Sequence, residues 1–124
     1  MYCEECGNPQ TECHHVVYRS QSIVMIEMDL NKKRLCNICH RGKEGPHLNK
    51  NKDLQYKTEV QEKLYKLICK EYYTPEGLEK TLKINANRVQ KIVKTLKIHN
   101  EGYNRDDIVR QLMGGRKYEC EVLV

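Results

Sequence analysis

The chain has 124 residues, of which 22 are basic and 17 acidic, so its formal net charge at neutral pH is +5. It contains seven cysteines but neither Trp nor Phe. This length allows one domain of ordinary size or two very small ones, each short of the area that a large apolar core requires. No apolar stretch reaches the roughly 18 residues of a membrane span, and the first residues lack the pattern of a signal peptide, so we expect a cytoplasmic protein.

The cysteines point to metal binding rather than to disulfides, because their number is odd and no secretory signal accompanies them. Cys3 and Cys6 form one C-x-x-C pair, followed directly by Gly7, and Cys36 and Cys39 form a second pair. Two such pairs supply the four soft ligands of a tetrahedral Zn²⁺ ion. The sequence therefore predicts a structural zinc site, which would stabilise a segment that has few large apolar residues.

The second half of the chain has helical periodicity. We expect a helix from Asp53 to about Tyr72, with Asp53 as its N-cap, because apolar residues recur there at spacings of three and four. These apolar residues are Val60, Leu64, Leu67 and Ile68. Gly, Pro, Asn and Lys cluster between residues 45 and 53, which places a domain boundary there and divides the chain into residues 1–52 and 53–124.

Three shorter helices are expected after this one. Thr74 followed by Pro75 is a typical helix start, and Asn85 can cap a helix that covers residues 88–96. A last helix is expected from Asn104 to Leu112, ended by the glycines at positions 114 and 115. Residues 118–124 are compatible with a short strand or a loose tail.

A pair of adjacent histidines, His14 and His15, lies between the two cysteine pairs. Neighbouring side chains of an extended segment point to opposite sides, so one histidine can bind a metal while the other stays free as a base. Asn31 precedes the second cysteine pair, and His40 follows it directly.

Together these residues resemble the HNH endonuclease family, in the zinc-bracketed form that is common in phage and prophage genomes. The resemblance covers residues 1 to about 52 and implies a ββα-metal fold, and hence an α+β class for the chain. The two histidines would lie on the first strand, Asn31 near the hairpin turn and His40 on the helix. The matching pattern is Cys3-x-x-Cys6, His14-His15-Val16-Val17 and Asn31-x-x-x-Leu35-Cys36-x-x-Cys39-His40.

The resemblance also implies what each residue does. His14 and His40 would bind a catalytic divalent cation such as Mg²⁺, Mn²⁺, Ni²⁺ or Zn²⁺. His15 would be the general base that takes a proton from the attacking water. Asn31 would hold the hairpin and orient this base, although the residue after it is Lys32, where the family usually has an apolar side chain.

The third ligand of the catalytic metal departs from the family pattern, which commonly has a histidine about one helical turn beyond the position of His40. Here Glu44 stands at that distance, and His47 follows Gly45 and Pro46. We favour His47, because glycine and proline interrupt the helix and allow the chain to fold back. Glu44 is the alternative and would suit a hard cation such as Mg²⁺ or Mn²⁺.

Residues 80–99 contain six basic side chains and no acidic one. With the preceding apolar segment they resemble a helix-turn-helix, whose second helix enters a groove of DNA. We expect phosphate contacts from the basic residues that recur every third position and base contacts from two amide side chains. The basic residues are Arg88, Lys91, Lys94 and Lys97, and the amides are Asn87 and Gln90. The alternative is a solvated basic face on an ordinary helical hairpin.

Two functions are compatible with these features. The first is an HNH-type DNA endonuclease or nickase that hydrolyses phosphodiester bonds with one divalent metal and a histidine base. Its helical module would direct it to DNA. The second is a zinc-stabilised regulator of phage origin that binds DNA or a protein partner through an inactive site. Neither involves a membrane.

Overall fold

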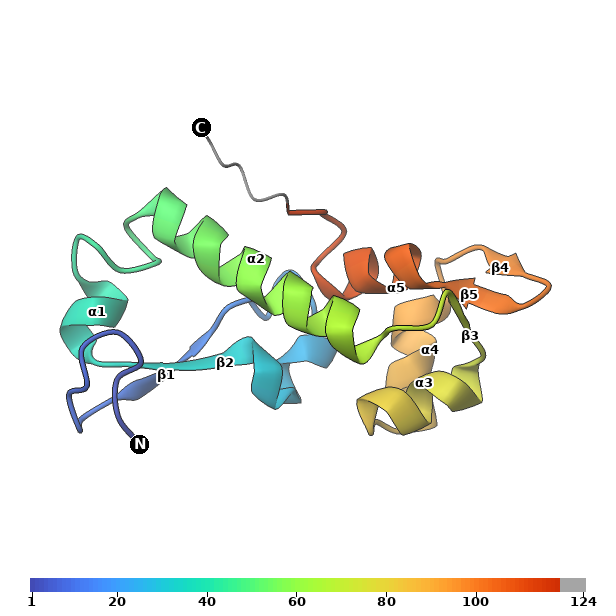
Figure 1. The fold of residues 1–124 in the computed structure, drawn as a ribbon, viewed down its shortest axis with the longest axis horizontal. Coiled ribbons are helices and arrows are strands. Elements are labelled where there is room, and N and C mark those ends of the chain that lie inside the picture. Colours follow the sequence, from blue (N-terminus) through green and yellow to red (C-terminus); the bar gives the residue numbers. More distant parts are fainter. Residues whose placement is uncertain (119–124) are drawn as a thin grey trace.

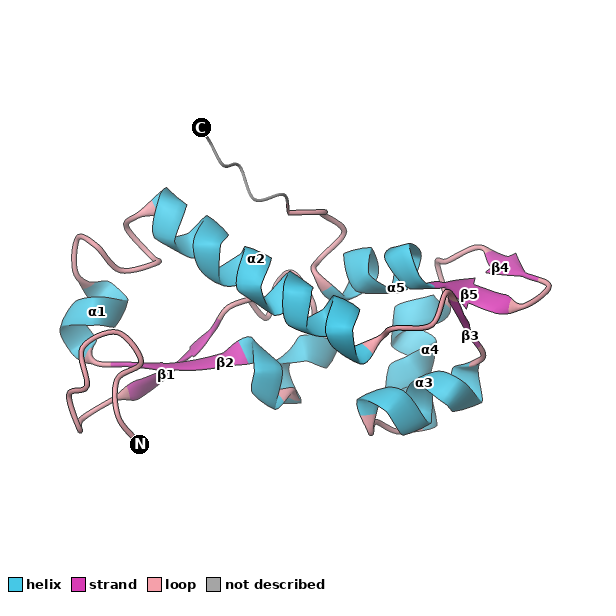
Figure 2. Ribbon diagram, viewed as in Figure 1, coloured by secondary structure: helices cyan, strands magenta, loops and turns pink. Residues whose placement is uncertain are grey.

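The computed structural model describes residues 1–118 and has a mixed α+β fold, which confirms the expected class. In this part of the chain there are five α-helices, two short 3-10 segments (η1 and η2) and two small sheets (Figures 1 and 2). Within residues 1–118 no helix is both long and apolar enough to cross a membrane. The elements, in chain order, are β1 (Glu12–His15), η1 (Val24–Glu27), η2 (Asp29–Asn31), β2 (Lys32–Leu35), α1 (Asn37–Arg41), α2 (Lys50–Leu67), β3 (Tyr72–Tyr73), α3 (Pro75–Leu82), α4 (Ala86–Val93), β4 (Ile98–His99), β5 (Gly102–Asn104) and α5 (Arg105–Leu112).

Strands β1 and β2 form an antiparallel hairpin, and Asn31 closes the long connection between them. The Asn31 side chain is fully buried, and its amide nitrogen donates to the carbonyls of Val17 and Met25, at 3.0 Å each. Its amide oxygen accepts from the Val17 N–H at 2.7 Å. The role of Asn31 in holding the hairpin therefore has a direct structural basis.

Helix α2 begins at Lys50, so the expected start at Asp53 was wrong. Asn49 is the N-cap, and its side-chain oxygen accepts from the amides of Asn51 and Lys52 at 3.0 and 3.1 Å. A cap four residues earlier extends the helix by one turn. The Asp53 carboxylate instead accepts from the Lys57 ammonium at 2.8 Å.

Helix α2 also ends earlier than expected, at Leu67 rather than near Tyr72. The Arg105 guanidinium donates to the carbonyls of Tyr65 and Ile68, at 2.7 and 2.6 Å, and so satisfies groups at the end of the helix. Residues 72–73 form β3, which pairs with β5. A contact from a residue far along the chain thus ends the helix.

Helices α3 and α4 are capped by the expected residues, although α4 begins at Ala86 rather than at residue 88, and α5 begins at Arg105, one residue after the expected start. The Thr74 hydroxyl accepts from the amide of Gly77, Pro75 is the first residue of α3, and the Asn85 side chain accepts from the amide of Arg88. Asn104 caps α5 in the same way.

Helix α4 ends at Val93, not at Leu96, so Lys94 is its C-cap and Lys97 lies beyond it. Strands β4 and β5 form a hairpin, and β3 pairs with the other edge of β5, which gives a sheet of order β3-β5-β4. Gly114 and Gly115 have positive φ angles of 83° and 87° and follow α5. A terminal strand or tail was expected over residues 118–124, of which residues 119–124 lie outside the described part of the chain.

Helix α2 connects the two ends of the molecule. It runs along the long axis, from the hairpin and α1 to the group of α3, α4 and α5 (Figure 1), and contacts both η2 and α5. Its buried face belongs to one apolar cluster that includes residues from both predicted domains. The predicted boundary at residue 52 falls within this helix. The α2 residues in the cluster are Tyr56, Val60 and Leu64.

We expect Asn31→Ala to lower the free energy of unfolding by about 2–3 kcal/mol, because it leaves the buried Val17 amide and carbonyl without their partner and removes one of the two donors to the Met25 carbonyl. Urea unfolding followed by far-UV circular dichroism measures this change. Asn51→Ala, at an exposed position of α2, is the control and should alter stability by less than about 0.5 kcal/mol. An equally small effect of Asn31→Ala would contradict the role assigned to Asn31.

Candidate functional site

The two C-x-x-C pairs come together in space. The sulfurs of Cys3, Cys6, Cys36 and Cys39 lie within 4.8 Å of one another, and the Sγ atoms of Cys6 and Cys36 are 3.6 Å apart. This separation is too long for a disulfide. It is close to the spacing of about 3.8 Å that a tetrahedral ion with Zn–S bonds near 2.3 Å imposes on its ligands. The four-cysteine cluster is therefore compatible with zinc binding, as predicted.

The electrostatics of the cluster favour a bound cation. Burial raises the pKa of the Cys3 thiol, but hydrogen bonds from the backbone at Cys36, Cys6 and Glu5 outweigh it and lower this pKa to about 6. Burial and the three neighbouring thiols raise the pKa of Cys39. One thiol ionises readily while its neighbours resist a second negative charge, so a divalent cation would be needed to hold all four as thiolates.

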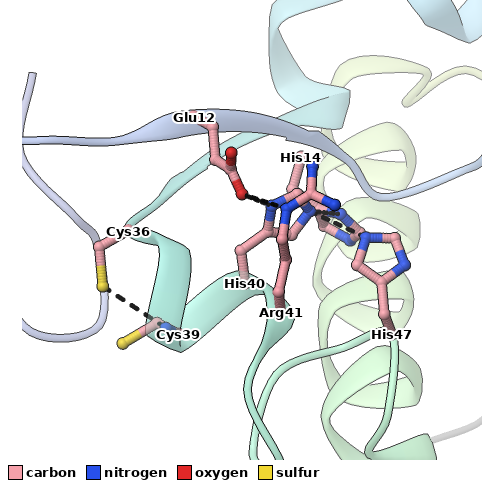
Figure 3. A network of polar contacts seen from close by, with 7 residues as sticks. All are labelled: Glu12, His14, Cys36, Cys39, His40, Arg41 and His47. Atoms are coloured by element: carbon pink, nitrogen blue, oxygen red, sulfur yellow. Dashed lines mark hydrogen bonds and ion pairs between the residues drawn. The ribbon is translucent and has the colours of Figure 1, made fainter.

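A second cluster consists of three histidines, from β1, α1 and the loop after α1 (Figure 3). Nδ1 of His14 lies 3.1 Å from Nε2 of His40, which in turn lies 2.8 Å from Nε2 of His47. One nitrogen from each ring lies within 4.8 Å of the other two. In a tetrahedral site with metal–nitrogen bonds of 2.0–2.1 Å, the ligand nitrogens would be about 3.3 Å apart. The structure thus brings together the three histidines that the sequence assigned to one metal.

The protonation states suit metal ligands. Burial, with contributions from His40 and His47, lowers the pKa of His14 to about 4, and burial also lowers the pKa of His47. Both rings are therefore neutral at pH 7. Nδ1 of His14 faces another imidazole, and its Nε2 is buried and has no hydrogen-bond partner within residues 1–118. Nδ1, which faces His40, is thus the nitrogen of His14 that could bind a cation shared with His40.

Glu12 orients His40. Its carboxylate oxygen lies 2.5 Å from Nδ1 of His40 and also accepts from the Arg41 guanidinium at 2.8 Å (Figure 3). These hydrogen bonds hold the pKa of Glu12 below its usual value. A carboxylate can only accept, so a neutral His40 donates from Nδ1 and presents the lone pair of Nε2 to the other two rings.

Gly45 allows His47 to return to the cluster. Helix α1 ends at Arg41, and the chain turns back over it through residues 42–45. A Cβ atom at position 45 would lie 2.4 Å from the His40 carbonyl oxygen, so only glycine permits this approach. Glu44, the alternative ligand, lies outside the histidine cluster and accepts from the Asn49 side chain at 2.9 Å.

His15, the predicted general base, is the last residue of β1 and lies opposite Lys32. Its side chain is half-buried, and strand alternation directs it to the side opposite His14. Within residues 1–118 its ring makes no hydrogen bond. Asn31 contacts Val17, two residues after His15, so Asn31 fixes the backbone near the base rather than its ring.

The predicted DNA-contacting residues do not share one face. Arg88 and Lys91 line a cleft of about 270 Å³ together with Arg19 and residues of η1. Lys94 and Lys97 lie at and beyond the end of α4, and Asn87 and Gln90 are exposed. Each step of three residues rotates the side chain by about 60° around the helix, which is why a repeat of three does not form a straight stripe.

Two residues near the histidines were not found from the sequence. Glu12 stands two positions before His14 on the same face of β1, so strand alternation could have indicated it. The Tyr18 ring stacks on that of His47, with an interplanar angle of 11° and centroids 6.1 Å apart. No motif in the sequence indicates this contact.

Comparison of the chain with protein-family models, with curated proteins and with solved structures found no match. The fold and the clusters define a small α+β protein with two candidate metal centres. A functional assignment therefore depends on their geometry.

We expect the purified protein to contain one zinc ion in its four-cysteine cluster, and Cys36→Ser to lose it. Loss of the ion should lower the melting temperature by more than about 10 °C, because zinc joins the N-terminal loop to α1. Elemental analysis and thermal unfolding measure both effects. Cys69→Ser is the matched control, since Cys69 is exposed and outside the cluster. Retention of zinc by Cys36→Ser would argue against a four-cysteine site.

Proposed function

We propose that the chain is a metal-dependent DNA endonuclease or nickase of the HNH type. The observation that carries this proposal is the convergence of His14, His40 and His47. His15, the residue after His14 in β1, has no hydrogen-bond partner within residues 1–118. An antiparallel hairpin followed by a short helix, bracketed by the four-cysteine cluster, supports the same assignment.

The proposed reaction is hydrolysis of a phosphodiester bond. The neutral form of the His15 ring accepts a proton as water attacks phosphorus. The bond from phosphorus to the 3′-oxygen breaks, and this oxygen takes a proton from solvent. A divalent cation held by His14, His40 and His47 would neutralise the charge that develops on the phosphate and the leaving oxygen.

Other residues of the chain position these groups. Glu12 fixes the tautomer of His40, and Asn31 holds the hairpin that carries His14 and His15. The pair of helices α3 and α4, with a turn of three residues between them, is proposed to bind duplex DNA. Arg88, Lys91, Lys94 and Lys97 would contact phosphates, while Asn87 and Gln90 would reach base edges.

We expect the wild-type protein to nick supercoiled plasmid in the presence of Mg²⁺, Mn²⁺ or Ni²⁺. His15→Ala should slow nicking by roughly 10²–10⁴-fold, the usual contribution of general-base catalysis, without weakening divalent-metal binding. Gel electrophoresis of the plasmid and calorimetric titration of the metal into zinc-loaded protein provide the two measurements.

Two further variants serve as controls in the nicking experiment. His47→Ala should lose both nicking and the second metal, whereas His99→Ala, on β4, should lose neither. If the wild type leaves the plasmid intact with every metal but still shifts it on a gel, catalysis is excluded and the inactive DNA-binding regulator is the better assignment.

For the helical module, we expect Arg88→Ala combined with Lys91→Ala to weaken duplex binding and to make it less dependent on salt, because phosphate contacts release counterions. Fluorescence anisotropy of a labelled duplex at several NaCl concentrations tests this expectation. The double variant Lys66→Ala with Lys70→Ala, at exposed positions, removes the same charge elsewhere. If the wild type and the double variant of Arg88 and Lys91 bind the duplex with equal affinity, these two residues belong to a solvated surface and do not contact DNA.

A further inference from the structure

A basic cleft lies between α2 and the chain that returns after α5. It has a volume of about 570 Å³. Figure 1 shows how the segment after α5 turns back toward the first half of α2. We call residues 115–118 the return segment. The cleft is lined by Lys50, Asp53 and Lys57 on the α2 side, and by Arg116, Lys117 and Tyr118 of the return segment.

The return segment is held in place by a side chain of α2. The Gln61 amide nitrogen donates to the Tyr118 carbonyl, and its oxygen accepts from the Tyr118 amide at 2.7 Å. Gln61 and Tyr118 are both buried, so these hydrogen bonds are shielded from water. Arg116 and Lys117 therefore occupy a defined position beside α2.

The charge of the cleft suits an anion. Four of the lining residues are cationic and one is acidic, and the acidic residue is already engaged. The Asp53 carboxylate accepts from Lys57 at 2.8 Å and from the Tyr18 hydroxyl at 3.0 Å. Within residues 1–118, Lys50, Arg116 and Lys117 form no salt bridge. These three side chains thus have no acidic partner among the described residues and could contact a bound anion.

The cleft lies next to the histidine cluster, because Tyr18 contacts residues of both. One side of this residue meets the cleft wall, since the Lys57 ammonium lies 4.3 Å from the ring centroid and Asp53 binds the hydroxyl. The same ring stacks on His47, the exposed member of the histidine cluster. The cleft and the histidine cluster are thus separated by the Tyr18 side chain, so that one extended polyanion could contact both.

We infer that this cleft binds the phosphate backbone of DNA next to the bond that is cut, with Lys50, Arg116 and Lys117 as the contacting residues. The position of the cut relative to the cleft rests on the proposed function, but the binding of the backbone does not. A nucleic acid is favoured over a single anion, because the cations come from both walls of the cleft and the cleft lies next to a second site that could hold an anion through a metal.

The test is equilibrium binding of a fluorescein-labelled DNA duplex to the full chain. EDTA removes free divalent metal so that no hydrolysis occurs, at a concentration that leaves the structural zinc in place. The variant is Arg116→Gln with Lys117→Gln, and the control is Lys66→Gln with Lys70→Gln, which removes the same charge from exposed positions. Anisotropy is measured from 50 to 300 mM NaCl. Loss of two phosphate contacts should reduce the slope of log K against log salt by about 1.8, and weaken binding at 0.1 M salt by roughly 10- to 60-fold.

Each outcome is decisive for the cleft. A reduced slope in the cleft variant but not in the control supports the inference, and equal effects in both variants, or none, overturn it. Equally tight binding of a polyglutamate peptide by the wild type, with the same sensitivity to the variant, would instead assign the cleft to acidic proteins. The binding experiment contains no added divalent metal, so its result does not depend on cleavage. If the protein binds DNA through the cleft but never nicks plasmid, the nuclease proposal is refuted and the cleft inference stands.

Discussion

The four-cysteine cluster brings the loop with Cys3 and Cys6 against helix α1, and a cation bound there would fasten these two segments. Cys3 and Cys6 belong to a loop, whereas Cys36 is the N-cap of α1 and Cys39 lies inside this helix. Four thiolates this close would repel one another, so a divalent cation among them would be needed to keep all four ionised. With that cation, β1, which follows the loop, is held against α1, and His14 lies beside His40.

Helix α1 links the two candidate metal centres. It has only five residues, too few to be stable by itself in water. Its first turn contributes Cys39 to one cluster, and the next residue, His40, contributes to the other. The hydrogen bond between Glu12 and His40 fixes the side of the helix that faces β1. The two centres are thus adjacent in sequence, and a displacement of one would move the other.

Features set by local chemistry could be predicted from the sequence, whereas features set by distant contacts could not. The predicted caps at Thr74 and Asn85 were correct because each depends on a few neighbouring residues. The predicted end of α2 was wrong because Arg105, nearly 40 residues further on, satisfies the last carbonyls of the helix. The predicted start of α2 was wrong because Asn49 and Asp53 are both good N-cap residues, and the sequence alone does not rank them.

The candidate site shows the same division. The spacing of the two C-x-x-C pairs indicated the four cysteines, whereas His14 and His40 followed from the resemblance to the HNH family and His47 from the glycine and proline before it. Glu12 was accessible through strand alternation but does not belong to any motif. Arg116 and Lys117 could not be found, because their position depends on a chain reversal after α5 and on Gln61, more than 50 residues earlier.

The histidine cluster also depends on a residue that contributes no functional group. At position 45 any side chain, even a methyl group, would collide with the backbone of His40 and push the following loop outward. His47 would then leave the cluster although every ligand of the site was chemically intact. A mutational survey scored by activity would therefore rank Gly45 among the most sensitive positions, and a search restricted to reactive side chains would overlook it.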